Sequence, residues 1–242
     1  MSARTPDDAT AAIAPAAGGL ERPAAVVFDS DGVLLDSEPA WKAARTELFE
    51  RHGRTFGEDE NRQAVGTGVA GTGRLLSRLL GRPDRAGDLS DEFEVLLSGE
   101  MAKGVRPLPG ALELAEELRG SVPIAVASNS PREILAGALE AAGLSDAFDV
   151  VIGVDEVSEA KPAPDLYLTA SERLGALPAE SIAVEDSPAG VAAARAAGLY
   201  VIGIPSLAGV ALEADMTADS LDDVAVRERL GVAEPAPRKR GR

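Results

Sequence analysis

Short apolar runs alternate with helical patterns over most of this chain. Each apolar run ends at turn or polar residues, which is typical of strands buried on both faces. Between the runs, apolar residues recur every three or four positions, which predicts amphipathic helices. The pattern predicts strands at 24–28, 122–127, 148–153, 181–184 and 200–204, with helices at 111–119, 131–142, 165–174 and 188–197 and a last amphipathic stretch at 221–230. Strands that alternate with helices predict an α/β fold.

The sheet in such a fold is parallel and doubly wound, of the Rossmann-like kind. Right-handed crossovers then place the carboxyl ends of all strands along one edge. Chemistry in open α/β sheets is found in the crevice outside this edge. Polar residues directly after each predicted strand are therefore the candidates for chemistry.

The stretch 37–104 departs from the alternation. Trp41, Ala44 and Leu48 recur at helical spacing, as do the leucines of 75–80, and no convincing strand interrupts them. A helical block inserted after the first strand predicts a cap domain over 37–104, with the core formed by 23–36 and 105–231. Glycine and proline at 104–110 predict a hinge between the two. We expect the tails, 1–22 and the basic 232–242, to be disordered.

Four glycines occur within the cap at 66–73. They predict a flexible loop, either a plain connection between helices or one whose backbone N–H groups meet a ligand. No Gly-Lys-Ser/Thr follows, so the segment is not a Walker loop.

Composition narrows the function classes. The net charge is −16, which argues against a nucleic-acid partner. There is no cysteine and only one histidine, His52, so neither a cysteine nucleophile nor a Ser-His-Asp triad of the usual pattern is expected. No apolar run has the length of a membrane span, and the N-terminus has no signal pattern. We expect a cytoplasmic protein that is a monomer or weak homodimer and binds no membrane.

Acidic residues follow two of the predicted strands. Asp29 and Asp31 come after the first strand, and Glu185 and Asp186 after the fourth. Close carboxylates repel one another unless a cation or a shared proton relieves them. Mg²⁺ prefers oxygen ligands, so it is the expected cofactor. Read alone, Glu185 and Asp186 are also compatible with solvated loop acids.

Two further features lie beside this edge. Ser128 and Asn129 end the second strand, and Ser130–Glu133 has the form of a capping box with proline at the first helical position. The helix amides would then form an anion site, although Ser128 alone is equally compatible with an ordinary helix start. Lys161 lies on a loop; the chain contains four lysines against twenty arginines, so lysine is not its habitual cation.

These residues resemble the motifs of the haloacid dehalogenase-like superfamily. Asp29-x-Asp31-Gly32 resembles the first motif, Ser128 the second, Lys161 the third and Glu185-Asp186 the fourth. The resemblance covers about 24–206 and implies a phosphatase with a helical cap. It implies Asp29 as nucleophile, Asp31 as general acid and base, and Ser128 and Lys161 as ligands of the phosphoryl group. Asp29, Asp186 and the backbone carbonyl of Asp31 would bind Mg²⁺, with Glu185 a further ligand, direct or through water.

The resemblance also bears on the substrate. Asp31 separates phosphatases from dehalogenases, and Trp41 stands where the related β-phosphoglucomutase carries a histidine. We therefore expect a phosphatase of a sugar or polyol phosphate, with a phosphosugar mutase as the alternative. A catalytically silent acidic binding protein is the alternative from another class. Candidates for substrate contact are Glu38, Trp41, Gly66 and Asn129.

Overall fold

The structure is a computed structural model that describes residues 22–64, 67–206 and 209–232. Apart from Arg22 and Val232, the two predicted disordered tails lie outside the described residues. So does Gly66, one of the predicted substrate contacts.

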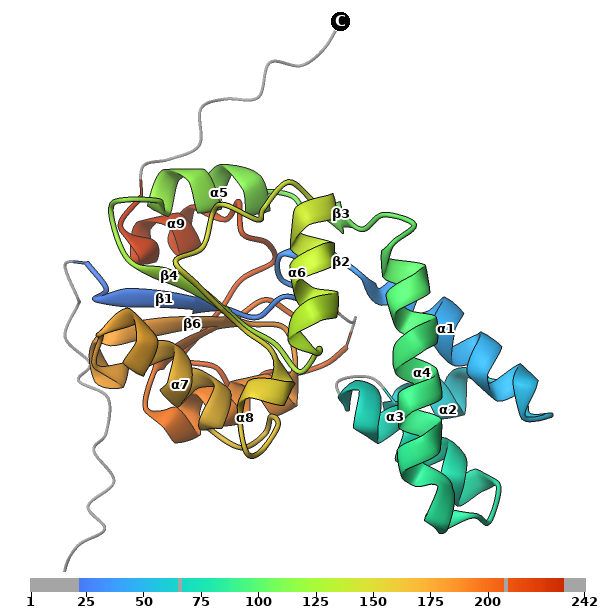
Figure 1. Cartoon of the computed structure of the whole chain (residues 1–242). Coiled ribbons are helices and arrows are strands. Elements are labelled where there is room, and N and C mark those ends of the chain that lie inside the picture. The colour runs from blue at the N-terminus through green and yellow to red at the C-terminus, as the bar shows by residue number, and fades with distance from the viewer. Residues whose placement is uncertain (1–21, 65–66, 207–208, 233–242) are drawn as a thin grey trace, which may run out of the picture.

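The central element is a six-stranded sheet in the order β5-β4-β1-β6-β7-β8 (Figure 1). Every pair of neighbouring strands is parallel, which confirms the predicted α/β fold. The strands are β1 (Ala25–Phe28), β4 (Ile124–Ala127), β5 (Val150–Ile152), β6 (Ser181–Glu185), β7 (Tyr200–Gly203) and β8 (Met216–Thr217). The five longer strands match the predicted apolar runs. The two-residue β8 has no apolar run of its own, and the sequence pattern missed it.

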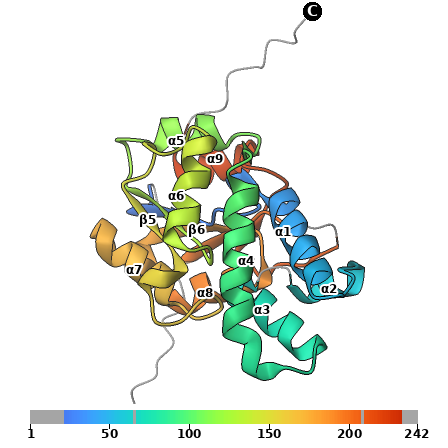
Figure 2. The same ribbon diagram turned by 45° about the vertical axis from the view of Figure 1, so that its right-hand side comes forward.

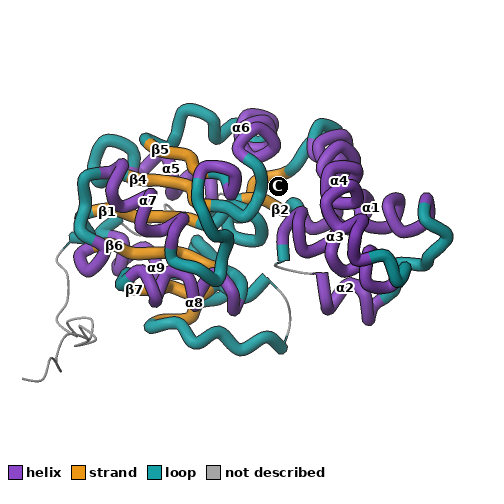
Figure 3. Tube along the Cα trace, turned by 60° about the horizontal axis from the view of Figure 1, so that its bottom comes forward, coloured by secondary structure: helices purple, strands orange, loops and turns teal. Residues whose placement is uncertain are grey.

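Helices cover both faces of the sheet. One face packs against α5 (Ala111–Leu118), α6 (Arg132–Ala141) and α9 (Val224–Leu230), and the other against α7 (Asp165–Leu174) and α8 (Pro188–Ala197) (Figures 1 and 3). In β1, Val26 and Phe28 join the first core and Val27 joins the second. Because both faces are buried, the strand is an uninterrupted apolar run. Short 3-10 helices occupy Pro83–Arg85, Val154–Glu156 and Pro178–Glu180.

Four helices between β2 and β3 pack mainly on one another. They are α1 (Glu38–Arg51), α2 (Glu58–Ala64), α3 (Gly68–Leu79) and α4 (Ala86–Met101). In Figure 2, α4 lies against both α1 and α3. Their position beyond the carboxyl ends of the strands is the one expected for a cap (Figure 1). The exact domain limits, 37 and 104, stay a prediction.

The predicted glycine loop is wrong for residues 68–73, which form the first turns of α3. The glycines serve close packing instead. A Cβ on Gly73 would lie 2.2 Å from Ser90 Oγ and 2.7 Å from Ser90 N in α4. The absence of a side chain therefore lets α3 and α4 approach closely, and this packing offsets the low helix propensity of glycine.

Two chain crossings join the helical block to the sheet. They form a small antiparallel ribbon of β2 (Leu35–Asp36) and β3 (Arg106–Pro107). The predicted hinge at 104–110 thus contains a paired strand. In the described part of the chain, no helix is both long and apolar enough to cross a membrane.

Candidate active site

The strand order explains why the predicted residues meet. Strand β1 lies between β4 and β6, so the residues that follow these three strands are neighbours. Asp29 follows β1, and its backbone N–H donates to the Val184 carbonyl of β6 at 2.9 Å. Ser128 follows β4 and Asp186 follows β6. The site is therefore assembled by sheet topology from segments far apart in sequence.

Lys161 is the cation at the centre of this site. Its Nζ donates to Asp29 Oδ1 at 2.5 Å, to Glu185 Oε1 at 2.6 Å and to the Ala127 carbonyl at 2.8 Å. An ammonium group has three donors, so all are engaged. Burial lowers the pKa of Lys161, but attraction to Asp29 and Glu185 outweighs it and raises the pKa overall. The lysine is therefore charged and held in place.

Asn129 fixes the backbone of Lys161. The Asn129 Oδ1 atom accepts from Lys161 N at 3.0 Å, and Asn129 Nδ2 donates to the Lys161 carbonyl at 3.5 Å. Asn129 also lines the pocket described below. Its predicted contact with substrate stays a prediction, and its observed contribution is to position the lysine.

Glu185 is fully buried and accepts five hydrogen bonds. Lys161 and Tyr167 Oη, the latter at 2.6 Å, donate to Oε1. Asp186 N, Ser187 N and Ser187 Oγ donate to Oε2. A direct bond from Glu185 to a metal would have to displace one of these donors. Its metal role stays a prediction, while its role in holding Lys161 is evident from the contacts.

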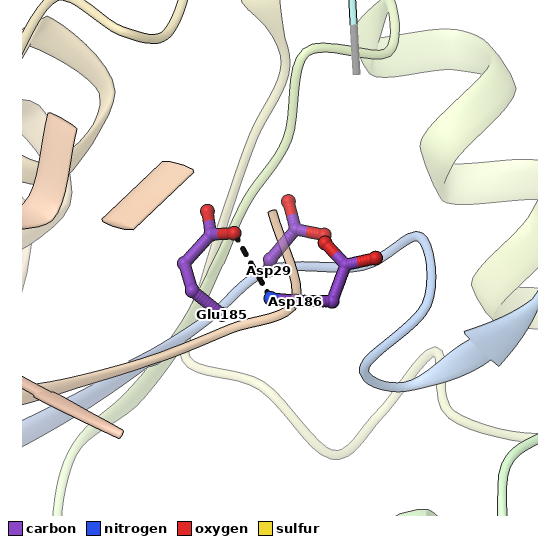
Figure 4. A group of neighbouring side chains, drawn as sticks. All are labelled: Asp29, Glu185 and Asp186. Atoms are coloured by element: carbon purple, nitrogen blue, oxygen red, sulfur yellow. Dashed lines mark hydrogen bonds between the residues drawn. The ribbon is translucent and has the colours of Figure 1, made fainter. Parts of the chain in front are cut away.

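Asp29 and Asp186 are better placed to hold a metal. Each of Asp29, Glu185 and Asp186 offers a carboxylate oxygen, and these atoms lie within 4.8 Å of one another (Figure 4). Among the described residues, no hydrogen bond engages Asp29 Oδ2. Asp186 Oδ2 accepts from Ser206 Oγ at 2.5 Å, which leaves its other oxygen available.

The charges of these carboxylates also fit a cation. Burial raises the pKa of Asp29 well above its usual value. The attraction of Lys161 offsets this rise only in part, and the repulsion of Asp29 by Glu185 and Asp186 adds to it. Burial, followed by repulsion from Glu185, raises the pKa of Asp186 to about 7. An all-oxygen donor set of excess negative charge suits Mg²⁺, so the residues present fit this metal.

Gly32 permits this arrangement. Its φ is +86°, a left-handed conformation, and a Cβ there would lie 2.2 Å from Asp186 Oδ2. Both the backbone turn and the close approach of Asp186 therefore require glycine.

Asp31 is held by four side-chain donors. Trp41 Nε1, at 3.1 Å, and Ser37 Oγ donate to Oδ1. Ser128 Oγ, at 3.3 Å, and Ser130 Oγ, at 3.0 Å, donate to Oδ2. Helix α1 and the core thus meet at this carboxyl group.

The predicted capping box at Ser130–Glu133 is wrong. Helix α6 begins at Arg132, with Pro131 as its N-cap and no side-chain cap. Ser130 Oγ donates to Asp31 instead, and Asp155 Oδ1 accepts from Arg132 N at 2.8 Å. Asp155 therefore already engages one amide of the predicted anion site, and anion binding by the others stays a prediction.

A pocket of about 360 Å³ opens at this edge of the sheet. Of the predicted site residues, it is lined by Asp29, Asp31, Glu38, Trp41, Asn129, Lys161 and Asp186. Ser128 lies behind Asp31, and Glu185 lies behind Lys161. The structure therefore brings together all the predicted site residues that it describes. Their individual roles stay predictions.

Several residues of the site were missed. They are Ser37, Arg45, Ser130, Tyr167 and Ser206. Ser206 follows the predicted strand 200–204, so its place after a strand end, like that of Ser128, indicates a site residue. Tyr167 and Arg45 lie inside helices, and no local pattern sets them apart from core positions.

Comparison with known proteins agrees with this geometry. A family model described as haloacid dehalogenase-like hydrolase matches residues 23–198. The chain is 34% identical over 184 residues to the bifunctional riboflavin kinase/FMN phosphatase of Arabidopsis thaliana, a match that covers 75% of this chain. It spans about half of that protein, 48% of its length.

Two further matches extend over nearly the whole of the related protein. Hexitol phosphatase A of Escherichia coli is 31% identical over 208 residues, which cover 84% of this chain and 94% of that protein. Among solved structures, CbbY from Rhodobacter sphaeroides in complex with phosphate aligns with a TM-score of 0.74 and 28% identity. That alignment covers 85% of this chain and 99% of the CbbY chain.

Proposed function

Because the chain belongs to the haloacid dehalogenase-like hydrolases, in their phosphatase branch, we propose that it is a Mg²⁺-dependent phosphatase of a sugar or polyol phosphate. Relatives named as phosphatases identify the reaction as hydrolysis of a phosphoric monoester. The relative named hexitol phosphatase supports the substrate class. The observation that carries the proposal is the Asp29 carboxyl group, which lines the pocket, has one oxygen bound to Lys161 and has no hydrogen bond on the other oxygen among the described residues.

The chemistry proceeds in two halves. An oxygen of Asp29 attacks phosphorus and forms an aspartyl-phosphate while the bond to the substrate alcohol breaks. Asp31 gives its proton to the departing alkoxide, then takes a proton from the water that attacks the aspartyl-phosphate. Inorganic phosphate leaves, and Asp29 is regenerated. Atoms and protons balance without a further reactant.

The other residues position and neutralise. Lys161 holds Asp29 and would neutralise the phosphoryl group, and Ser128, whose hydroxyl donates to Asp31 in this structure, would turn to donate to the phosphoryl oxygens. Mg²⁺ would be held by Asp29, Asp186 and the Asp31 backbone carbonyl, and it would supply charge neutralisation for the phosphoryl group. Phosphoryl transfer depends mostly on such positioning and neutralisation.

The test is phosphate release from a panel of sugar and polyol phosphates, with and without Mg²⁺. Asp29→Asn should lower the rate by at least about a thousandfold, because the nucleophile is lost while the shape is kept. Asp84→Asn is the matched control, since that carboxylate is exposed and pairs with Arg82; it should leave the rate unchanged.

Two other outcomes would overturn the proposal. Conversion of a hexose 1-phosphate to the 6-phosphate without phosphate release would identify a mutase. Absence of turnover with every ester, in a folded protein with Mg²⁺ present, would support the alternative of a binding protein.

A further inference from the structure

One face of helix α1 carries three polar side chains to the pocket. Glu38, Trp41 and Arg45 are spaced three and four residues apart, so they lie on the same face of the helix. All three line the pocket. Trp41 is engaged with Asp31, which leaves Glu38 and Arg45 as the polar groups that the reaction itself does not use.

Arg45 is fixed although its hydrogen-bonding capacity is not used up. Its side chain is only 2% exposed. The guanidinium carbon lies 5.0 Å from the centre of the Trp41 ring, and Nη2 donates to the Ala64 carbonyl at 3.4 Å. Within the described residues, Nε and Nη1 are buried without a hydrogen-bond partner. A buried guanidinium with unused donors is costly unless a water molecule or a ligand meets them.

Glu38 is in a matching situation. Its Oε1 atom lies 3.5 Å from Arg45 Nη1, an ion pair that is too long to satisfy either atom. Oε1 is also buried without a hydrogen-bond partner among the described residues. Burial raises the pKa of Glu38 and lowers that of Arg45. The pair therefore offers unused donors and an unused acceptor side by side.

The charge around the pocket indicates what these groups bind. Six carboxylates line it, Asp29, Asp31, Asp36, Glu38, Asp186 and Asp219, against the two cations Lys161 and Arg45. Lys161 is committed to Asp29, and Glu38 largely balances the charge of Arg45. A second phosphate or carboxylate on the substrate would meet no free cation among the described residues that line the pocket. A neutral hydroxyl group can both accept from Arg45 and donate to Glu38.

We propose that Arg45 and Glu38 select the substrate by binding hydroxyl groups of its alcohol part, so that the enzyme favours the monophosphate of a neutral polyol over a bisphosphate. This inference rests on the proposed function and names the residues that set its specificity. Binding energy away from the reacting phosphorus then aligns the ester with Asp29.

The test compares three esters: a hexitol monophosphate, n-hexyl phosphate without hydroxyls, and a hexose bisphosphate. Arg45→Met keeps most of the side-chain volume but removes the donors. The loss of kcat/KM in Arg45→Met should be about 10- to 100-fold greater on the hexitol phosphate than on hexyl phosphate. This is the size of effect expected from the loss of hydrogen bonds to a charged group. Glu38→Gln removes the repulsion between the Glu38 carboxylate and a second phosphate. It should therefore narrow the preference for the monophosphate over the bisphosphate.

The matched control is Arg51→Met on the same helix. Arg51 is 49% exposed and pairs with Glu47, so this variant should keep the wild-type ratios. Equal losses on the hexitol and hexyl esters in Arg45→Met would show that Arg45 only supports the helix and would overturn the inference. A wild-type enzyme that prefers the bisphosphate would also overturn it.

Two measures keep the test decisive. If Arg45→Met does not fold by circular dichroism, Glu38→Gln carries the comparison of the monophosphate with the bisphosphate, since it keeps the size of the side chain. Mg²⁺-dependent turnover of hexyl phosphate, lost in Asp29→Asn, tests the proposed function separately. A failure of specificity is thereby distinguished from a failure of the phosphatase assignment.

Discussion

Lys161 offers the sharpest test at the scale of single residues. It is buried between Asp29 and Glu185. Lys161→Met would leave both carboxylates buried without their cation, so we expect a loss of about 3–5 kcal/mol in the free energy of unfolding at pH 8. Burial already raises the pKa of Asp29, and loss of the lysine removes the opposing attraction. The penalty should therefore shrink as the pH falls and the carboxyl groups are protonated.

Urea unfolding at pH 8 and pH 5 checks this expectation. Lys103→Met is the control, because Lys103 is 69% exposed and pairs only with nearby Glu100 in the described structure. If Lys161→Met lost the same free energy of unfolding at both pH values, the loss would come from packing and not from the charge of the lysine. That result would contradict this prediction.

Asp186 makes a second prediction, on pH and metal. Its pKa of about 7 lies above the usual value of 3.8. A carboxyl group with a raised pKa favours the folded state at pH below about 4, and this contribution is lost as the pH rises through 7. Mg²⁺ binds the ionised form, so protons compete with it and its apparent affinity should fall about tenfold per unit below pH 7.

The measurement is the shift in melting temperature caused by Mg²⁺ at pH 6 and pH 8. The shift should be larger at pH 8, and Asp186→Asn should remove most of it. A Mg²⁺ effect that is the same at both pH values would argue against Asp186 as a ligand.

At the scale of elements, the connection from α4 to β3 sets a prediction about the cap. Gly104 has a φ of +108°, and its N–H donates to the Met101 carbonyl at 3.1 Å. Gly104→Pro would force a negative φ and remove this bond, so it should displace α1–α4 relative to the sheet and lower turnover of a polyol phosphate several-fold. Trp41, the only tryptophan, is buried against Asp31 and would report such a displacement by a red-shifted emission.

Gly81→Pro is a closely matched control. Gly81 also has a positive φ, +67°, and its N–H also donates at 3.1 Å, to the Arg78 carbonyl. It lies after α3, away from the crossing to the sheet. The Gly81→Pro variant should be less stable than the wild type, but its turnover and its tryptophan emission should be unchanged. Unchanged kinetics in Gly104→Pro would contradict a hinge at this place.

The same scale separates what the sequence could predict from what it could not. Strands such as β1 and β4 were predictable because burial on both faces leaves a continuous apolar run. Asp29, Ser128 and Asp186 followed from their place after these strands. The start of α6 was not predictable, because Asp155, which binds the Arg132 amide, is distant in sequence. The first turns of α3, residues 68–73, were missed for the same reason, since Gly73 is explained by contact with α4.

Arg45 and Tyr167 show the limit of prediction from sequence for residues of the site. Each lies at a helical position that, in sequence, is indistinguishable from an ordinary buried or half-buried one. Their importance comes from what lies opposite in the folded chain, Glu38 in the case of Arg45 and the buried Glu185 in the case of Tyr167. Local pattern carries no information on such partners.

For the whole molecule, charge is the dominant feature. The chain carries a net charge of −16, and carboxylates outnumber cations around the pocket. An anionic substrate is therefore repelled on its approach, and salt screens that repulsion over about 10 Å at 0.1 M. We expect kcat/KM to rise several-fold between 20 and 200 mM NaCl for a polyol monophosphate, and to rise more steeply for a bisphosphate, which carries more charge.

This salt series must be measured with saturating free Mg²⁺, because salt also weakens metal binding, which would act in the opposite direction. Under that condition the sign of the slope is decisive. A rise shows that the field of the whole protein opposes the substrate and that affinity comes from the local groups, Lys161, the metal and the hydroxyl contacts of Arg45. A fall in kcat/KM would show a net attractive path into the site, and the exclusion of a second phosphate would then have to come from shape alone.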